Sequence, residues 1–254
     1  FISKLPPEVI ARTPRSHYSQ PIMHFKLILI SLFLVLAMPH TSRAEKLSED
    51  LNSAVAYAYF HVGEDDSPLP HISTAVFQSH IADITTPEND YHPASLDDIL
   101  KAQANNTSLP EKTITLTFEG TDSSFLHTVF PLLEDHKIPF TLFISPGLID
   151  QGEKGNDPDI LSWDDVRTIA TSDLATIGIT SYSYTHIDGK TAEALAEDIN
   201  RARDRFRAEL KKEPLYFSFP YGEYSQTYLN IIAKQGFAGS FGQQSGVIST
   251  SSSR

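Results

Sequence analysis

Apolar, strand-like runs alternate with segments of helical spacing along most of this chain, and this order is the strongest constraint on its fold. Such an alternation implies a parallel sheet whose strands are joined by helical crossovers. It predicts an α/β fold, arranged either as an open doubly wound sheet or as most of a barrel. No glycine-rich nucleotide-binding pattern follows any strand, which weakens the doubly wound alternative. The expected strands are Ala54–Phe60, Thr113–Phe118, Pro139–Ile144, Thr176–Ile179, Tyr216–Phe219 and Ala238–Phe241.

The helices between these strands are indicated by apolar spacing and by serine residues that can cap a helix start. Ser95 and Ser162 are each followed three residues later by an aspartate, which favours a helix N-terminus. Pro131 lies inside one helical pattern and predicts a kink or a late start. The stretch Gln151–Pro158 is polar and rich in turn residues, so we expect a loop there. The expected helices are Ser73–Ile84, Ser95–Ala104, Ser123–His136, Ser162–Thr171, Ala192–Lys211 and Ser225–Gln235.

The N-terminal part of the chain has the features of a leader rather than of a folded domain. Residues 1–22 are interpreted as an upstream, non-structural segment. Met23 begins a short positive region, followed by the apolar run Leu27–Met38 and the small residues of Thr41–Ala44. This order is typical of a secretory signal at residues 23–44, with cleavage after the last of them, and it predicts a periplasmic or secreted protein. The run is short for a membrane span, although an uncleaved N-terminal anchor is the alternative.

The remaining residues, 45–254, are expected to form one domain. The chain carries 20 basic and 32 acidic residues, and removing residues 1–44 would take away five basic residues and one acidic residue, changing the net charge from −12 to −16. This charge argues against nucleic acid or anionic lipid as a partner. The absence of cysteine excludes disulfides and thiol catalysis. The serine-rich tail Ser245–Arg254 ends soon after a strand, which suggests that the domain is incomplete at its C-terminus.

Two strand ends carry groups that suit chemistry. Glu119 directly follows one buried-type strand, and the turn Pro220–Gly222 follows another. The carboxyl ends of parallel strands are where α/β enzymes place their reactive groups. Between these two segments, the stretch Ile177–His186 contains few side chains that could bind a metal.

At these residues the sequence resembles the polysaccharide deacetylase family, also known as the NodB-homology domain or the fourth carbohydrate esterase family. The resemblance implies an irregular (β/α) barrel and removal of acetyl groups from the N-acetylated sugars of a polysaccharide. It also implies a divalent, zinc-like metal held by one Asp and two His, with a second Asp as general base. It spans roughly Ala54 to Gly246 and is carried by Ala58–Gly63, Leu116–Gly120, Pro131–Leu133, Ile138–Ile144, Leu161–Trp163, Ile177–Gly178 and Phe219–Gly222.

Several positions of the family's motifs hold other residues in this chain. Glu119 stands where the family has its general-base Asp, and Gly120 stands where it has the metal-binding Asp. Thr180 and Tyr184 occupy the positions of the two metal-binding His. Ser218 replaces the Arg of the motif that ends in Pro-Tyr-Gly.

Glu119 and Tyr221 are therefore the expected catalytic residues. Glu119 keeps the carboxylate of the base, one methylene longer, and the alternative is an ordinary acid at a strand end. Pro220 and Tyr221 match the family's motif, and the resemblance implies that the amide after the proline helps to hold the oxyanion.

Asp122 and His186 are the candidate metal ligands, together with Glu119. Asp122 lies in the loop after Glu119, and its alternative role is to cap the helix that begins near Ser123. His186 lies two residues beyond the second His position, and its alternative is a surface histidine. His61 follows a strand and is interpreted as a loop histidine.

The candidate substrate-binding residues are aromatic or amide-bearing. Tyr182 and Tyr184 are interpreted as pocket walls or sugar-stacking rings, and Pro220 belongs to the Pro-Tyr-Gly turn described above. Gln243 and Gln244 follow the last strand, and their amides suit a hydroxyl-rich ligand. Together these residues predict a hydrolase that deacetylates a polysaccharide or oligosaccharide, with no specific protein partner; the alternative is a non-catalytic carbohydrate-binding relative that has lost the metal site.

Overall fold

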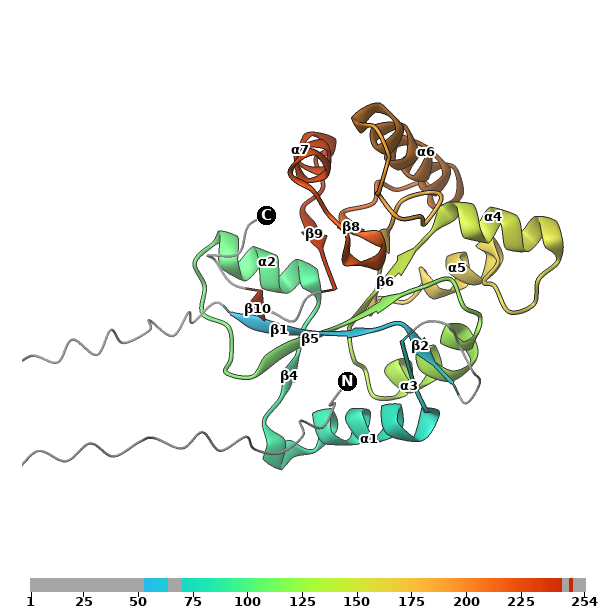
Figure 1. Cartoon of the computed structure of the whole chain (residues 1–254). Coiled ribbons are helices and arrows are strands. Elements are labelled where there is room, and N and C mark those ends of the chain that lie inside the picture. The colour runs from blue at the N-terminus through green and yellow to red at the C-terminus, as the bar shows by residue number, and fades with distance from the viewer. Residues whose placement is uncertain (1–52, 64–69, 244–246, 249–254) are drawn as a thin grey trace, which may run out of the picture. The chain divides into compact units, whose positions relative to one another are not determined.

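A sheet of mostly parallel strands forms the centre of the protein (Figure 1). The computed structural model describes residues 53–63, 70–243 and 247–248. The short strand β4, His92–Pro93, pairs with the start of β5, and β10, Val247–Ile248, runs antiparallel to β1. A separate two-stranded sheet joins β2, His61–Val62, to β3, His71–Ile72. The main parallel strands are β1 Ala54–Tyr59, β5 Thr113–Glu119, β6 Phe140–Ile144, β7 Ala175–Ile179, β8 Tyr216–Ser218 and β9 Gly239–Phe241.

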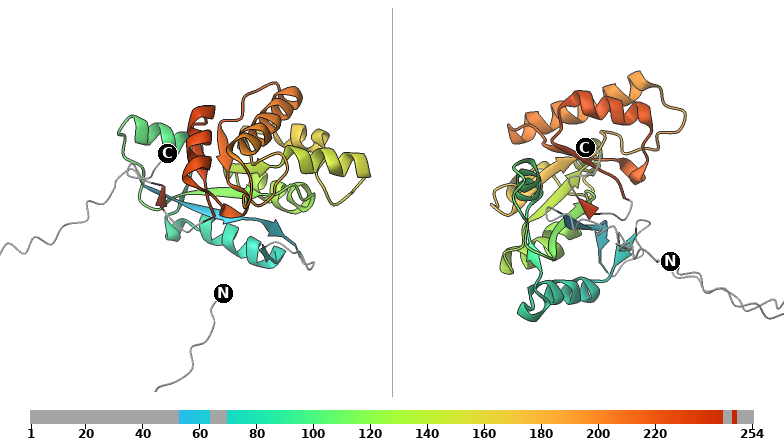
Figure 2. Two further views of the ribbon diagram at one scale, coloured as in Figure 1. Left: turned by 45° about the horizontal axis from the view of Figure 1, so that its top comes forward. Right: turned by 90° about the vertical axis from the view of Figure 1, so that its left-hand side faces the viewer.

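The order of the strands decides between the two architectures that the sequence allows. Neighbouring strands follow the order β10-β1-β5-β6-β7-β8-β9, so the parallel strands lie side by side in the order in which they occur in the chain. A doubly wound sheet would instead reverse its strand order at a switch point. The sheet therefore winds in one direction and curls as part of a barrel, as the family resemblance implied (Figure 2). Among the described residues, β9 is the last strand on this path.

Four of the described helices begin after a serine cap. The hydroxyls of Ser73, Ser95, Ser162 and Ser225 each accept a hydrogen bond from the N–H three residues later, and Ser162 forms a full capping box with Asp165. Short 3₁₀ turns cover Pro87–Asn89 and Pro220–Gly222 (η3). The α-helices are α1 Thr74–Thr85, α2 Leu96–Ala104, α3 Phe130–Asp135, α4 Pro146–Gly155, α5 Trp163–Ile169, α6 Ala192–Leu210 and α7 Gln226–Gln235.

The helix that contains Pro131 is irregular, as its sequence predicted. A π-helical segment, η2 at Phe125–Val129, precedes α3, and the N–H of Phe130 reaches back to the carbonyl of Phe125. Proline has no N–H and its ring collides with the preceding turn, so the backbone there cannot continue a regular α-helix from the N-terminal side.

The prediction of a loop at Gln151–Pro158 is wrong, because α4 extends through most of that stretch. Its buried face includes Gly147 and Gly152, and both glycines allow close packing. A Cβ on Gly152 would lie 2.6 Å from Ile160 Cγ2, and a Cβ on Gly147 would lie 2.2 Å from the carbonyl oxygen of Tyr182. Tertiary packing therefore selects this helix, although its local helix propensity is low.

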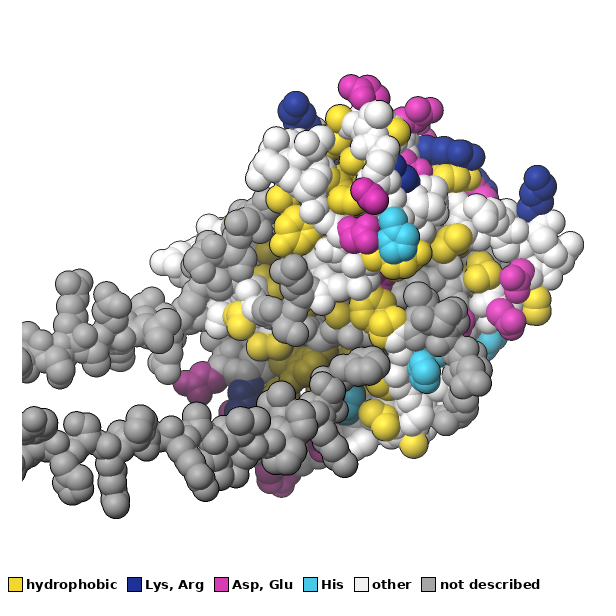
Figure 3. Space-filling model, in the orientation of Figure 1, with side chains coloured by type: hydrophobic (Ala, Val, Ile, Leu, Met, Phe, Trp, Pro, Cys, Tyr) yellow, Lys and Arg dark blue, Asp and Glu magenta, His cyan; other side chains and the backbone are white. Residues whose placement is uncertain are grey.

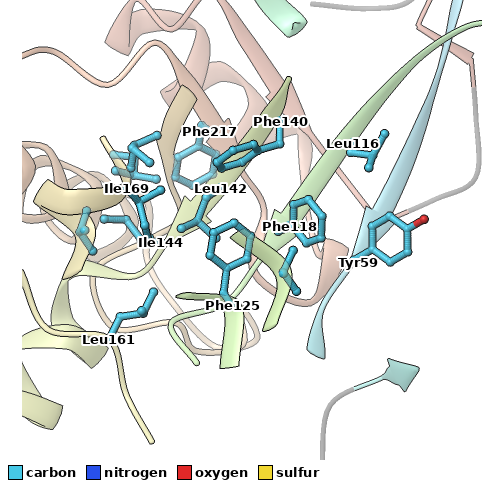
Figure 4. Close-up of a cluster of buried hydrophobic side chains, with 14 of the residues drawn as sticks. Tyr59, Leu116, Phe118, Phe125, Phe140, Leu142, Ile144, Leu161, Ile169 and Phe217 are labelled. Atoms are coloured by element: carbon cyan, nitrogen blue, oxygen red, sulfur yellow. The ribbon is translucent and has the colours of Figure 1, made fainter. Parts of the chain in front are cut away.

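Aromatic side chains hold β5 in place against its neighbours (Figure 4). The rings of Phe118 and Phe125 lie 5.1 Å apart edge to face, and those of Phe125 and Phe140 lie 5.5 Å apart. Such arrangements stabilise a core beyond the burial of apolar area alone. The strand that carries Glu119 is thus anchored from both η2 and β6.

Helices lie on both sides of the strands. In Figures 1 and 2, α1 lies on the side opposite to α6 and α7. Within the described part of the chain, no helix combines the length and apolar character needed to cross a membrane. The leader at residues 23–44, the segment before it and the tail from residue 249 lie outside the described residues, so those interpretations stay predictions.

Replacing Gly178 by alanine tests the packing of β7, the strand that leads into the family's histidine positions. A Cβ at Gly178 would lie 2.6 Å from two ring atoms of Phe143 and 3.1 Å from the carbonyl oxygen of Tyr216. We expect Gly178→Ala to lower the free energy of unfolding by about 1–3 kcal/mol, measured by urea denaturation.

The matched control is Gly155→Ala, at the last residue of α4, where a Cβ would meet nothing within 4 Å. This variant should be neutral or more stable by less than about 1 kcal/mol. Equal stabilities for the two variants would contradict the packing described here.

Candidate active site

The carboxyl ends of four parallel strands bring three side chains together around Glu119. Glu119 is the last residue of β5, Tyr184 follows β7, Ser218 ends β8 and Gln243 follows β9. Because the strands run in the same direction, these ends meet at one edge of the sheet. The carboxyl group of Glu119 is thus contacted by Tyr184, Ser218 and Gln243, which lie 65, 99 and 124 positions further along the chain.

The Glu119 carboxyl group accepts a hydrogen bond from each of these three side chains. The hydroxyl of Tyr184 donates to Oε1 at 2.7 Å, and the amide Nε2 of Gln243 donates to the same oxygen at 3.2 Å. The hydroxyl of Ser218 donates to Oε2. All three donors are uncharged, and Glu119 is only 6% exposed.

Burial sets the acid–base behaviour of this group. Removal from water raises the pKa of Glu119 above its usual range, and the hydrogen bonds from Ser218, Tyr184 and Gln243 oppose that rise only in part. Burial, followed by the neighbouring Glu119, also raises the pKa of Tyr184, so its hydroxyl keeps its proton and acts as a donor. A carboxyl with a raised pKa suits a general base that must later return the proton.

Three aromatic rings in contact lead from Glu119 to the surface. The ring of Tyr184 lies 5.0 Å from that of Tyr221, and Tyr221 stacks on His186 at 4.0 Å with an angle of 15° between the rings. Tyr221 and His186 are exposed, whereas Tyr184 is half-buried. On the face seen in Figure 3, hydrophobic side chains lie beside acidic side chains and a histidine. The rings therefore connect the buried carboxyl group with solvent.

The residues at the family's metal positions do not fit a metal ion. Gly120 has no side chain, and its φ of 150° is rarely adopted by other residues. Thr180 is fully buried, and its hydroxyl is oriented toward the carbonyl oxygens of Ser181 and Ile144, at 3.2 and 3.4 Å. Tyr184 directs a protonated hydroxyl at Glu119 instead of a nitrogen at an ion.

Asp122 and His186 do not meet Glu119 in a metal site, contrary to the sequence prediction. Asp122 accepts a hydrogen bond from the N–H of Ser124 at 2.7 Å, and its other oxygen lies 3.4 Å from Nδ1 of His61. Among the residues that the structure describes, no three His, Asp or Glu side chains are close enough to hold a metal ion. The alternative role for Asp122, capping the helical segment that follows, agrees with the first contact.

His186 is held at the surface by an acid that the sequence analysis did not single out. Its Nδ1 lies 2.8 Å from Oε1 of Glu223, whose other oxygen accepts the N–H of Ile187 at 3.1 Å. These contacts lower the pKa of Glu223, with His186 as the largest cause. The histidine therefore supports the Tyr221 ring rather than the Glu119 carboxyl group.

The remaining substrate-binding candidates lie in different surroundings. Tyr182 donates its hydroxyl to Asp150 at 2.8 Å and packs under the guanidinium of Arg201, away from the Glu119 cluster. Pro220 is buried at the start of η3, and Gln244 lies outside the described residues. Of the two glutamines, it is Gln243 that the structure places on Glu119.

A small cavity lies at the carboxyl end of β5. Its volume is about 10 Å³, near the smallest that holds one water molecule. Phe118, Phe125 and Leu142 line it together with Asp122. Glu119 and Gly120 line it as well, so the cavity lies next to the strand end that carries the hydrogen-bonded cluster.

Residues 106–240 match the model of the polysaccharide deacetylase family, and the chain belongs to this family. It is 25% identical over 279 residues to a poly-β-1,6-N-acetyl-D-glucosamine N-deacetylase of Escherichia coli, covering 89% of this chain and 41% of that protein. It is 21% identical to a protein of the same name from Staphylococcus aureus, over 83% of each chain. The chain thus spans less than half the length of the E. coli relative.

Solved structures support the same fold. A de-N-acetylase from Aggregatibacter actinomycetemcomitans superposes with a TM-score of 0.69 at 18% identity, over 79% of this chain and 92% of that one. IcaB from Ammonifex degensii superposes with a TM-score of 0.67 at 24% identity, over 76% of this chain and 84% of that one. The predicted barrel of the deacetylase type is confirmed.

Ser218 and Glu223 are the site residues that sequence reasoning missed. Ser218 was recognised only as a replacement for arginine, yet its position two residues before Pro220 was the available signal for a contact with Glu119. Glu223 directly follows the Pro-Tyr-Gly turn, but its contact with His186 joins loops 37 residues apart. No local pattern indicates that pairing.

The raised pKa of Glu119 predicts a specific pH dependence of stability. The folded protein keeps the Glu119 proton to a higher pH than the unfolded chain, so its stability is greatest below the ordinary pKa and falls as pH rises through the folded-state pKa. Glu119→Gln removes this titration. We expect its free energy of unfolding to increase relative to wild type with rising pH, by at most about 1.4 kcal/mol per pH unit.

Urea denaturation of both proteins from about pH 4 to about pH 8 measures this difference. Glu111→Gln, at an exposed position before β5, is the matched control and should differ from wild type by a constant amount. A difference for Glu119→Gln that does not change with pH would contradict the assignment.

Proposed function

We propose that this chain hydrolyses the acetamide groups of an N-acetylated glucosamine polymer, releasing acetate and leaving free amines. The observation that carries the proposal is Glu119, a carboxyl group with a raised pKa at the position of the family's general base. Membership of the polysaccharide deacetylase family and the names of the E. coli and S. aureus relatives support the substrate class.

The proposed reaction uses Glu119 as base and then as acid. Its carboxylate takes a proton from a water molecule, whose oxygen forms a bond to the carbonyl carbon of the acetamide. The C–N bond then breaks, the nitrogen takes the proton from Glu119, and acetate and an amine are released. The backbone N–H of Tyr221, which follows Pro220, is the proposed donor to the oxyanion.

The polymer would lie against the aromatic rings at the mouth of the site. Tyr221 is 39% exposed and is supported from behind by His186. An exposed, fixed ring offers a sugar a flat apolar face while leaving its hydroxyls in water. The net charge of −12 is compatible with a product that gains positive charge as acetyl groups are removed. The proposed location, periplasmic or secreted, rests on the leader at residues 23–44.

A second candidate function is binding of the same polymer without hydrolysis. It is favoured by Gly120 and Thr180, which supply no side-chain ligand where the family holds its metal. In this case the Glu119 cluster would recognise the acetamide group and leave it intact.

Acetate release from β-1,6-linked N-acetylglucosamine oligomers tests the proposal, with the mass of the oligomer as a second readout. We expect wild type to release acetate and Glu119→Gln to do so at least about 10²-fold more slowly, because general acid–base catalysis contributes a factor of this size. Glu111→Gln is the control and should keep the wild-type rate.

Two results would contradict the proposed hydrolysis. Unchanged acetate release by Glu119→Gln would show that Glu119 takes no part in the reaction. Saturable binding of the oligomer by wild type without any release of acetate would favour the second candidate.

A further inference from the structure

Two tyrosines at the site have a left-handed backbone conformation, which residues other than glycine rarely adopt. Tyr184 has a φ of 46° and Tyr221 a φ of 57°. For a bulky residue, a positive φ in this range costs free energy and persists only where the surroundings hold it. The other described non-glycine residues with positive φ are Asp90, Asn106, Lys112, Lys137, Asn156 and Lys211, none of which is aromatic.

Contacts with neighbouring side chains hold these tyrosines in place. Tyr221 contacts the rings of His186 and Tyr184, and its hydroxyl donates to the carbonyl oxygen of Tyr184 at 3.5 Å. Glu223 fixes His186 and the backbone of the same loop. The result of this arrangement is that the Tyr184 hydroxyl lies 2.7 Å from Oε1 of Glu119.

This hydroxyl lies where the sequence pattern of the family would place a metal ligand. Neither Gly120 nor Thr180 offers a side-chain ligand to a metal ion. Gly120 has no side chain, and the hydroxyl of Thr180 is oriented toward backbone carbonyls. The side chains that do converge at this point are a carboxyl group, a phenol, a serine hydroxyl and an amide. This set is suited to hydrogen bonding with a neutral amide and not to coordination of a divalent cation.

We propose that the Tyr184 hydroxyl takes the place of a metal ion, so that the site recognises the acetamide group of its ligand without any divalent cation. The hydroxyl turns from Glu119 to the acetamide carbonyl oxygen, and Glu119 keeps its hydrogen bond from Ser218. The inference rests on the proposed function for the class of ligand, an N-acetylated glucosamine oligomer. It does not depend on whether the acetamide is then hydrolysed.

Metal dependence is the first test. The full chain is treated with a chelator, and binding of β-1,6-linked N-acetylglucosamine oligomers is measured by calorimetry with and without Zn²⁺, Co²⁺ or Ni²⁺. We expect the dissociation constant to change less than about twofold, and elemental analysis of the purified protein to find no stoichiometric metal. One bound metal per chain, whose removal weakens oligomer binding tenfold or more, would overturn the inference.

Tyr184→Phe is the second test, since it removes the hydroxyl and keeps the ring. We expect its affinity for the acetylated oligomer to fall about five- to tenfold, whereas its affinity for the deacetylated oligomer stays unchanged. The preference of wild type for the acetylated ligand would therefore be lost. A purely structural role for Tyr184 would weaken the binding of both oligomers equally.

Tyr224→Phe is the matched control, because Tyr224 is an exposed tyrosine in the loop after η3 and should keep the wild-type preference. Thermal unfolding of each variant confirms that the fold is retained. Tyr184→Phe with an unchanged preference for the acetylated oligomer would overturn the inference.

The outcomes separate this inference from the proposed hydrolysis. Acetate release that requires an added metal would overturn the role of Tyr184 and leave deacetylation standing. Metal-independent preference for the acetylated oligomer without acetate release would support the role of Tyr184 and contradict the proposed hydrolysis.

Discussion

The burial of one carboxyl group determines how this edge of the sheet is built. Removing a carboxylate from water is costly unless it is hydrogen-bonded or protonated, so Glu119 requires donors from whichever elements surround it. Those donors come from the ends of β7, β8 and β9, which are distant in sequence. The cluster therefore ties the C-terminal half of the sheet to β5.

Most elements of the fold could be predicted because their signals are local. Two of these signals, the serine caps and the apolar stripe along Ala192–Leu210, correctly predicted helices. The third, Pro131, correctly predicted an irregular helix at its position. The helix α4 could not be predicted, because it is stabilised where Gly147 and Gly152 allow Tyr182 and Ile160 to approach. Contacts of this kind lie in the tertiary structure and leave no periodic pattern in the sequence.

The site could be predicted in part for the same reason. Glu119 and Gln243 were recognised because strand ends in a parallel sheet meet at one edge. Asp122 and His186 were not brought together, since each finds a partner nearby: Asp122 has the backbone of Ser124, and His186 has Glu223. The contact of Tyr184 with Glu119 depends on a left-handed backbone that sequence alone does not indicate for a tyrosine.

The replacements at this site change its electrostatics. The resemblance to the deacetylase family places an arginine at position 218 and an aspartate at position 119, and a cation beside an acid favours its ionised form. Here a serine takes the first position, and the longer side chain of Glu119 still reaches it. The carboxyl group remains hydrogen-bonded but loses its opposing charge, and burial then raises its pKa. A site of neutral donors around such an acid is complementary to an uncharged amide, which is the group that an N-acetylated sugar presents.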